Sequence, residues 1–191
     1  MRTSFTPISG SGTLVSLRIP RVSGFSLDEL HASGSLGVQA LEWLQAIVQS
    51  RVAFLLTGGT GTGKTTLLSA LLSLVDPGDR LVLVEDSAEL KPRHPHVVFL
   101  QSRHRNIEGA GEVSVRDLVR QALRMRPTRI VMGEVRGREI IDFLLALNTG
   151  HDGGCGTIHA NSARDVPSRI AALGLLHDVS REAMNAQLGS A

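Results

Sequence analysis

Short apolar runs alternate with stretches of helical spacing along most of the chain. Continuous apolar runs occur at 52–56 and 81–84, and a similar run follows Arg129 within 129–132; such runs are typical of strands that are buried on both faces of a parallel sheet. Apolar residues recur at helical spacing within 38–48, 64–75 and 115–123. Strands that alternate with helices in this way predict a doubly wound α/β fold.

Two capping boxes and one alternating segment add detail to this pattern. Ser26 with Glu29, and Ser114 with Asp117, predict the first turns of two helices. The segment 13–19 alternates like a half-buried strand before Pro20. We therefore divide the chain into residues 1–35, a residual N-terminal strand and linker region, and residues 36–191, the α/β domain.

Composition excludes several classes of protein. The 191 residues carry a net charge of only +2 and 3% aromatic residues, which gives no argument for a nucleic-acid partner. The single cysteine excludes an internal disulfide and fits a reducing compartment. No apolar run approaches the roughly 18 residues of a membrane span, and the N-terminus lacks a signal-peptide pattern.

The loop at 58–65 matches the phosphate-binding pattern G-x-x-x-x-G-K-[ST] in full. A predicted buried strand precedes it and a predicted helix follows, which disfavours the alternative of a glycine-rich turn without a ligand. We expect Lys64 to reach the β- and γ-phosphates of ATP, and Thr65 to ligate Mg²⁺. The predicted nucleotide-binding residues are Gly58, Gly59, Thr60, Gly61, Thr62, Gly63, Lys64, Thr65 and Thr66.

Carboxylates follow two of the predicted buried strands. Glu85 and Asp86 come after one strand, with Glu89 nearby, and Glu134 comes after the other. The carboxyl ends of parallel strands form the edge where ligands bind, so we expect these acids near the phosphate loop. Glu134 is the candidate for positioning or deprotonating the attacking water, and Glu85 and Asp86 are candidates for supporting Mg²⁺ directly or through its waters. Taken singly, acids at strand ends are more often structural.

The segment 149–161 is rich in glycine and polar residues. A histidine there, at the end of a short strand, can donate a hydrogen bond to a γ-phosphate. One alternative is a zinc site of His151, Cys155 and His159, although their spacing does not match a standard zinc motif. Another is Cys155 as a nucleophile, for which no oriented base is evident.

Arginines form two groups. Arg116, Arg120 and Arg124 make a stripe at helical spacing, whose simplest interpretation is a solvated helix face. Arg103 and Arg105 lie in a polar loop, from which an arginine can reach the nucleotide of a neighbouring subunit.

The order of these motifs resembles a known family. After the phosphate loop come VEDSAEL at 84–90, LVRQALRMRP at 118–127, GEVRG at 133–137, and TGHDG through TIHANS at 149–162. This order resembles the bacterial type II/type IV secretion traffic ATPases, and within them the tight-adherence (Flp pilus) motors. The resemblance covers about residues 13–191 and implies a RecA-like P-loop NTPase fold, with a doubly wound, mostly parallel sheet and flanking helices.

The resemblance also implies roles for single residues. Residues 58–65 match the Walker A loop of the family, Glu85, Asp86 and Glu89 its aspartate box, Glu134 the catalytic acid of its atypical Walker B motif, and His159 its His box. Arg103 and Arg105 fall where the family has basic residues near the subunit boundary. The implied catalytic residues are Glu134, Lys64, His159, Glu85, Arg103 and Arg105. The implied metal ligands are Thr65, Glu85 and Asp86.

We therefore expect a Mg²⁺-dependent ATPase domain that powers bacterial protein secretion or pilus assembly. Members of the family form hexameric rings on inner-membrane secretion or pilus platform proteins, at the cytoplasmic face. The family's N-terminal domain and its last strands and helices have no counterpart in the sequence, so we expect this chain to assemble and hydrolyse ATP poorly. The alternatives are a nucleotide-binding module with little or no turnover, a conjugation-type DNA-transfer motor, and a kinase-like P-loop enzyme.

Overall fold

A computed structural model describes residues 2–4, 12–16, 24–105 and 111–191. Of the strand expected at 13–19, the described part is β2 (Leu14–Ser16), which pairs antiparallel with β1 (Arg2–Ser4). The rest of that expected strand lies outside the described residues. In the described part of the chain, no helix is both long and apolar enough to cross a membrane.

The central sheet has five parallel strands in the order β3-β7-β6-β4-β5. The strands are β3 (Phe54–Thr57), β4 (Leu81–Glu85), β5 (Val97–Gln101), β6 (Arg129–Val135) and β7 (Cys155–Ile158). Because all five run in one direction, their carboxyl ends meet at one edge of the sheet. The predicted α/β class with a mostly parallel sheet is confirmed.

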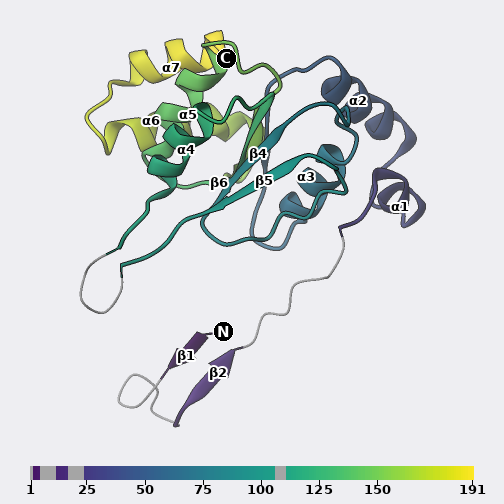
Figure 1. Cartoon of the computed structure of the whole chain (residues 1–191), viewed down its shortest axis with the longest axis horizontal. Coiled ribbons are helices and arrows are strands. Elements are labelled where there is room, and N and C mark those ends of the chain that lie inside the picture. The colour runs from purple at the N-terminus through teal and green to yellow at the C-terminus, as the bar shows by residue number, and fades with distance from the viewer. Residues whose placement is uncertain (1, 5–11, 17–23, 106–110) are drawn as a thin grey trace.

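Helices cover both faces of this sheet (Figure 1). One face carries α1 (Leu27–Ala32), α2 (Val38–Gln49) and α3 (Lys64–Leu72). The other carries α4 (Val115–Leu123), α5 (Glu139–Leu147), α6 (Val166–Leu175) and α7 (Arg181–Ser190), with a short 3₁₀ turn at Ala163–Asp165 before α6. The predicted capping boxes are present at Ser26 in front of α1 and at Ser114 in front of α4.

Alternate residues of β4 supply two separate cores. Val82 and Val84 pack with α4 and α5, whereas Leu81 and Leu83 pack with α3, and all four side chains are fully buried. This is the burial on both faces that the apolar run at 81–84 predicts. Leu27 of α1 is buried in the same core as α3.

The apolar run at 52–56 predicts a strand that is buried on both faces. The structure has a strand there, but the strand is less buried than predicted. The strand β3 begins at Phe54, and its four residues are only half-buried. Within the described sheet β3 is an edge strand that pairs with β7 alone, so fewer side chains cover it. The phosphate loop thus leaves the sheet from an exposed edge.

Candidate nucleotide site

The loop at residues 58–65 connects β3 to α3 and presents an uncapped helix N-terminus. Gly63, the N-cap residue of α3, has φ 90° and ψ 12°, a left-handed conformation that a side chain would strain. No side chain caps this helix start, whereas serines cap α1 and α4. The first N–H groups of α3 are therefore available to an anion, and the helix dipole favours one there.

Lys64 holds the loop closed on itself. Its Nζ donates hydrogen bonds to the carbonyl oxygens of Gly58 (2.8 Å) and Gly59 (2.7 Å). The hydroxyl of Thr62 donates to the same Gly59 carbonyl at 2.9 Å. A phosphate that enters the loop would replace two neutral acceptors of the ammonium group with charged ones, which form stronger hydrogen bonds.

The carboxyl ends of β4 and β6 meet the start of α3 around a small cavity. This acid cavity, about 50 Å³ in volume, is lined by Thr65, Glu85, Asp86, Ser87, Glu89, Gly133 and Glu134. The structure thus brings the sequence-predicted acids together with Thr65 of the phosphate-binding pattern. A space of this size suits a small cation or one or two waters.

Glu85 is the most enclosed acid of the cavity. Its side chain is 5% exposed, and its Oε1 accepts hydrogen bonds from the backbone N–H groups of Glu89 and Leu90, both at 3.0 Å. Burial raises the pKa of Glu85, and the two backbone donors oppose that rise. Gly133 makes room for it, because a Cβ at Gly133 would lie 2.6 Å from Cγ of Glu85.

A β-bulge in β6 sets the direction of the Glu134 side chain. Met132 is opposite Gly156 and Val135 is opposite Ile158, so two residues of β6 face Thr157 alone. The buried hydroxyl of Thr157 donates to the carbonyl of Gly133 at 2.6 Å and fixes this bulge. Sequence reasoning missed Thr157, because a threonine inside a strand gives no signal of such a contact.

Asp86 and Glu134 share a basic neighbour. Arg136 Nη2 donates to Oε2 of Glu134, and Nη1 of the same guanidinium lies 4.0 Å from Oδ2 of Asp86. The hydrogen bond to Glu134 raises the pKa of Arg136. Asp86 also accepts a hydrogen bond from the hydroxyl of Ser102, and its Oδ1 lies 3.6 Å from Nε2 of His104.

His159 lies level with the start of the phosphate loop. Ile158 pairs with Thr57, and the Thr57 hydroxyl donates to the carbonyl of Ala160 at 3.2 Å. His159, whose side chain is exposed, thus follows the last β7 residue that pairs with β3, just as Gly58 follows its partner Thr57.

Cys155 and His151 occupy different surroundings from His159. Burial raises the pKa of the Cys155 thiol to about 12, which disfavours a thiolate as metal ligand or nucleophile. The Nδ1 of His151 lies 3.1 Å from the carbonyl oxygen of Ala146, within hydrogen-bonding distance. These contacts favour a structural role for both residues.

Arg103 and Arg105 lie at the edge of the sheet opposite to β3, and Arg103 shares a hollow with Asp86 of the acid cavity. They follow β5, which is four strands from β3, so about 19 Å of sheet separates these two strands. Arg103 Nε donates to the carbonyl of Gly111 at 2.6 Å, and Arg105 donates to Glu112. The chain on either side of residues 106–110 extends away from the sheet (Figure 1).

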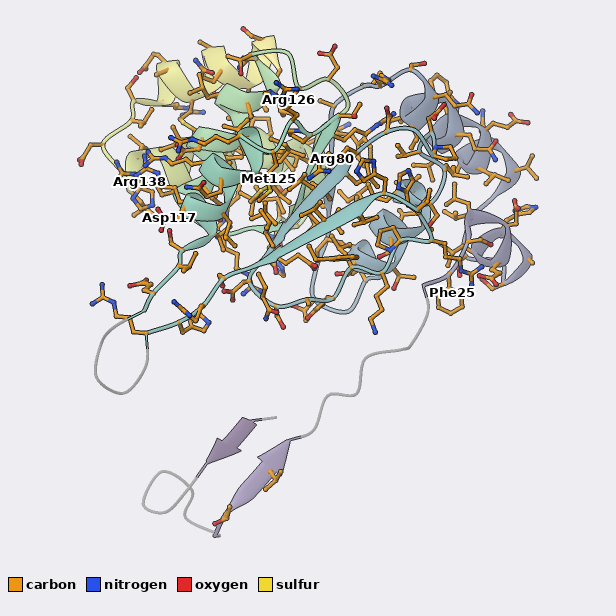
Figure 2. The ribbon with its side chains drawn as sticks, in the orientation of Figure 1. Phe25, Arg80, Asp117, Met125, Arg126 and Arg138 are labelled. Atoms are coloured by element: carbon orange, nitrogen blue, oxygen red, sulfur yellow. The ribbon has the colours of Figure 1, made fainter. Side chains whose placement is uncertain are left out.

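A second hollow, about 460 Å³ in volume, opens on this side of the molecule. Its walls include Asp86, Arg103, Arg116 and Arg138. Figure 2 labels Arg138 and Asp117 on this side, near the starts of α5 and α4. We refer to this feature as the outer hollow.

The donor atoms of the acid cavity fit Mg²⁺. Hydroxyl and carboxylate oxygens are the ligands that this cation prefers, and Thr65, Glu85 and Asp86 supply them. Within the described residues, no group of three or more His, Cys, Asp or Glu side chains is spaced to hold a metal by itself. Mg²⁺ in phosphate-loop enzymes binds through one or two protein ligands together with phosphate oxygens and waters, so the cavity satisfies that weaker requirement.

Comparisons of sequence find relatives over most of the chain. Residues 1–189 match the family model described as Type II/IV secretion system protein. The chain is 55% identical over 185 residues to a putative conjugal transfer protein of Mycobacterium tuberculosis, which covers 97% of this chain and 53% of that protein. It is 42% identical over 138 residues to the type IV secretion system protein PtlH of Bordetella pertussis, covering 71% and 40%. The chain thus spans about half the length of these curated relatives, or less.

Solved structures share the fold. The VirB11 ATPase of the Brucella suis type IV secretion system, in complex with sulphate, superposes with a TM-score of 0.69 at 27% identity and covers 94% of this chain and 59% of that one. The pilus retraction motor PilT with bound ADP gives 0.68 at 26% identity and covers 94% and 49%.

Proposed function

Because the chain belongs to the type II/IV secretion system protein family, we propose that it is the ATP-binding and ATP-hydrolysing core of a motor for bacterial protein secretion or pilus assembly. One observation carries the proposal: Thr65 at the start of α3 shares a cavity with carboxylates from the ends of β4 and β6. A phosphate cradle needs acids at that position to hydrolyse a bound nucleotide, and a simple anion-binding turn does not.

The proposed reaction is attack of water on the γ-phosphorus of ATP. A bond forms between the water oxygen and the γ-phosphorus, and the bond to the β–γ bridging oxygen breaks. Glu134 accepts the proton of the water, and Lys64 stabilises the charge on the β- and γ-phosphates. Thr65, Glu85 and Asp86 would hold Mg²⁺, which supplies charge neutralisation at the phosphates.

Three further residues complete the proposal. His159 is exposed and follows the last β7 residue that pairs with β3, where its ring can donate to the γ-phosphate. Arg103 and Arg105 lie about 19 Å of sheet away from β3, so we assign them to the site of a neighbouring subunit. The binding loop is Gly58 through Thr65, with Thr66 in the first turn of α3.

The assembly that we propose is a homo-oligomer, with the hexameric ring of the family as its model, at the cytoplasmic face of the inner membrane. Its partners would be secretion or pilus platform proteins of that membrane. The relatives named for conjugal transfer and type IV secretion favour a conjugation-type motor as the second candidate. Direct contact with nucleic acid is not part of the proposal, since the net charge is only +2.

The deciding experiment compares the chain's two lysines, Lys64 and Lys91. Binding of ATP and release of phosphate are measured with Mg²⁺ and with a chelator. Lys64→Ala should lose nucleotide binding, because the ammonium is the mobile cation of the loop, whereas Lys91→Ala should retain it. Binding without phosphate release would favour the module with no turnover. Equal nucleotide affinity in Lys64→Ala and the parent would refute the assignment of the loop.

A further inference from the structure

Arg136 contacts the proposed catalytic carboxylate directly, and none of the roles above uses it. Its guanidinium bonds to Glu134 and reaches within 4.0 Å of Asp86. Both carboxylates line the acid cavity with Thr65. A positive charge therefore lies between two acids beside the place that the Walker A loop gives to the terminal phosphate.

The backbone that carries Arg136 is fixed, whereas its side chain is exposed. Val135 is 1% exposed, and Oε1 of Glu139 accepts hydrogen bonds from the N–H groups of Arg136 and Gly137, both at 2.7 Å. The Arg136 side chain is 66% exposed. A long side chain on a rigid base can exchange one partner for another without moving the strand.

The pair with Arg136 conflicts with the role of Glu134 as a base. The lone pairs of Oε2 that accept from the guanidinium are not available to the attacking water. A guanidinium binds phosphate oxygens in a bidentate geometry, and a terminal phosphate offers three oxygens. A γ-phosphate at the loop is therefore a strong competitor for Arg136, and ADP does not provide it.

We propose that Arg136 is a positioning residue that responds to the γ-phosphate: without a triphosphate it occupies Glu134, and with one its guanidinium turns to the γ-phosphate and releases Glu134 to the attacking water. This inference rests on the proposed function, because it requires nucleotide at residues 58–65. The Glu134–Arg136 pair then holds one carboxylate oxygen of Glu134 away from the attacking water while the site holds ADP.

The test measures the affinity of the full chain for Mg²⁺–ADP and for a non-hydrolysable ATP analogue. Arg136→Gln should weaken binding of the analogue about three- to tenfold and change ADP affinity less than about twofold, since an exposed charge-assisted contact is worth about this much. Arg136→Lys, which keeps the charge, should recover part of the loss. Arg138→Gln is the matched control: it removes an exposed arginine of the outer hollow two residues away and should change neither affinity.

Coupling to Glu134 distinguishes this inference from a simple surface ion pair. Glu134→Gln weakens the hold on Arg136, so it should tighten binding of the analogue, and the gain should be absent when Arg136→Gln is present as well. Equal losses for ADP and the analogue, or additive effects in the double variant, would overturn the inference while leaving the proposed function intact. A parent chain that binds neither nucleotide would refute the proposed function and the inference together.

Discussion

The hydroxyl of Thr157 on β7 donates a 2.6 Å hydrogen bond to the carbonyl of Gly133 on β6. This contact lies at the bulge where Gly133 and Glu134 face a single residue of the neighbouring strand. The Glu85 side chain packs over Gly133 and lines the acid cavity, and a Cβ at residue 133 would clash with it. One buried hydroxyl thus supports the positions of both proposed acids.

Replacing Thr157 tests this support. Thr157→Val keeps the shape but leaves the Gly133 carbonyl without its partner, which should cost about 1 kcal/mol of folding free energy. The rate of phosphate release should fall further than this loss of stability explains, because Glu134 loses its direction. Thr157→Ser keeps the hydroxyl and should restore turnover. Thermal melting and steady-state phosphate release on the three chains check this, and a Thr157→Val chain with the parent rate would contradict it.

The sequence predicts the phosphate loop and the two central strands better than the other elements of the fold. The loop at 58–65 and the apolar runs at 81–84 and 129–132 carry strong local signals, and the structure places them as α3's start, β4 and β6. The edge strand β5 (Val97–Gln101) also begins with an apolar run of four residues, but our sequence analysis does not assign a strand there. Helices α5, α6 and α7 were likewise not assigned individually.

The contacts inside the site depend on register, which local patterns do not encode. The bond of Thr157 to Gly133 joins residues 24 positions apart, and the bond of Thr57 to Ala160 joins residues 103 apart. The pairing of Arg136 with Glu134 joins residues only two positions apart, but the sequence does not show that Arg136 also lies near Asp86, which lines the acid cavity together with Glu134. Acids at strand ends can be predicted from sequence, whereas the partners of these acids require the folded sheet.

The ionised side chain of Glu85 should lower the free energy of unfolding at neutral pH. Burial raises its pKa above the ordinary 4.5, so the folded chain holds this proton more tightly than the unfolded chain does. The resulting stabilisation is complete below about pH 4.5 and is lost as the pH rises through the folded pKa. Glu85→Gln, which can still accept from Glu89 and Leu90, should therefore raise Tm at pH 7 by a few degrees.

Two further measurements complete the test of Glu85. The gain in Tm should shrink as the pH falls through the folded pKa, and it should vanish well below 4.5, where Glu85 is protonated in either state. Phosphate release should decrease in the same variant, because the amide is a poorer partner for Mg²⁺. A lower Tm at pH 7 would show that the ionised carboxylate stabilises the fold instead.

Glu134→Gln should separate binding from hydrolysis. The amide keeps the size of the side chain and can still accept a hydrogen bond, but it cannot take a proton from water. Loss of one such base slows the reaction by ~10²–10⁴-fold. Nucleotide titrations together with single-turnover phosphate release test this, and an unchanged rate would move the role of base to Glu85 or Asp86.

His159→Ala should affect the triphosphate more than the diphosphate. His159 follows Ile158, the partner of Thr57 at the end of β3, so its expected partner is the γ-phosphate, which ADP lacks. We expect slower turnover and weaker binding of a non-hydrolysable ATP analogue, with ADP affinity nearly unchanged. His151→Ala is the control, since His151 lies against the carbonyl of Ala146 and its loss should lower Tm without changing the preference for triphosphate. Equal losses of ADP and analogue affinity would instead make His159 structural.

Arg103 and Arg105 should act on the site of a neighbouring subunit. They follow β5 at one edge of the sheet, while the phosphate loop leaves β3 at the other, about 19 Å away. Contacts to Gly111 and Glu112 hold both arginines at that edge. A chain that lacks both arginines keeps Glu134 and the acid cavity, but it supplies no arginine to the site of its neighbour. The Glu134→Gln chain supplies the arginines but lacks the proposed base in its own site.

Mixing these two inactive chains should therefore restore phosphate release. In a ring with random order, roughly a quarter of the interfaces would combine an intact Glu134 with intact arginines from the next subunit. A trans-acting arginine is worth ~10³–10⁵ in rate, so this fraction should rise far above either variant alone. The assay is phosphate release from a titrated mixture, with light scattering in the presence of a non-hydrolysable ATP analogue to confirm assembly. If the mixture assembles but stays as inactive as its components, the arginines do not act across the interface. A single chain that keeps its full rate without them would show that hydrolysis does not need them at all.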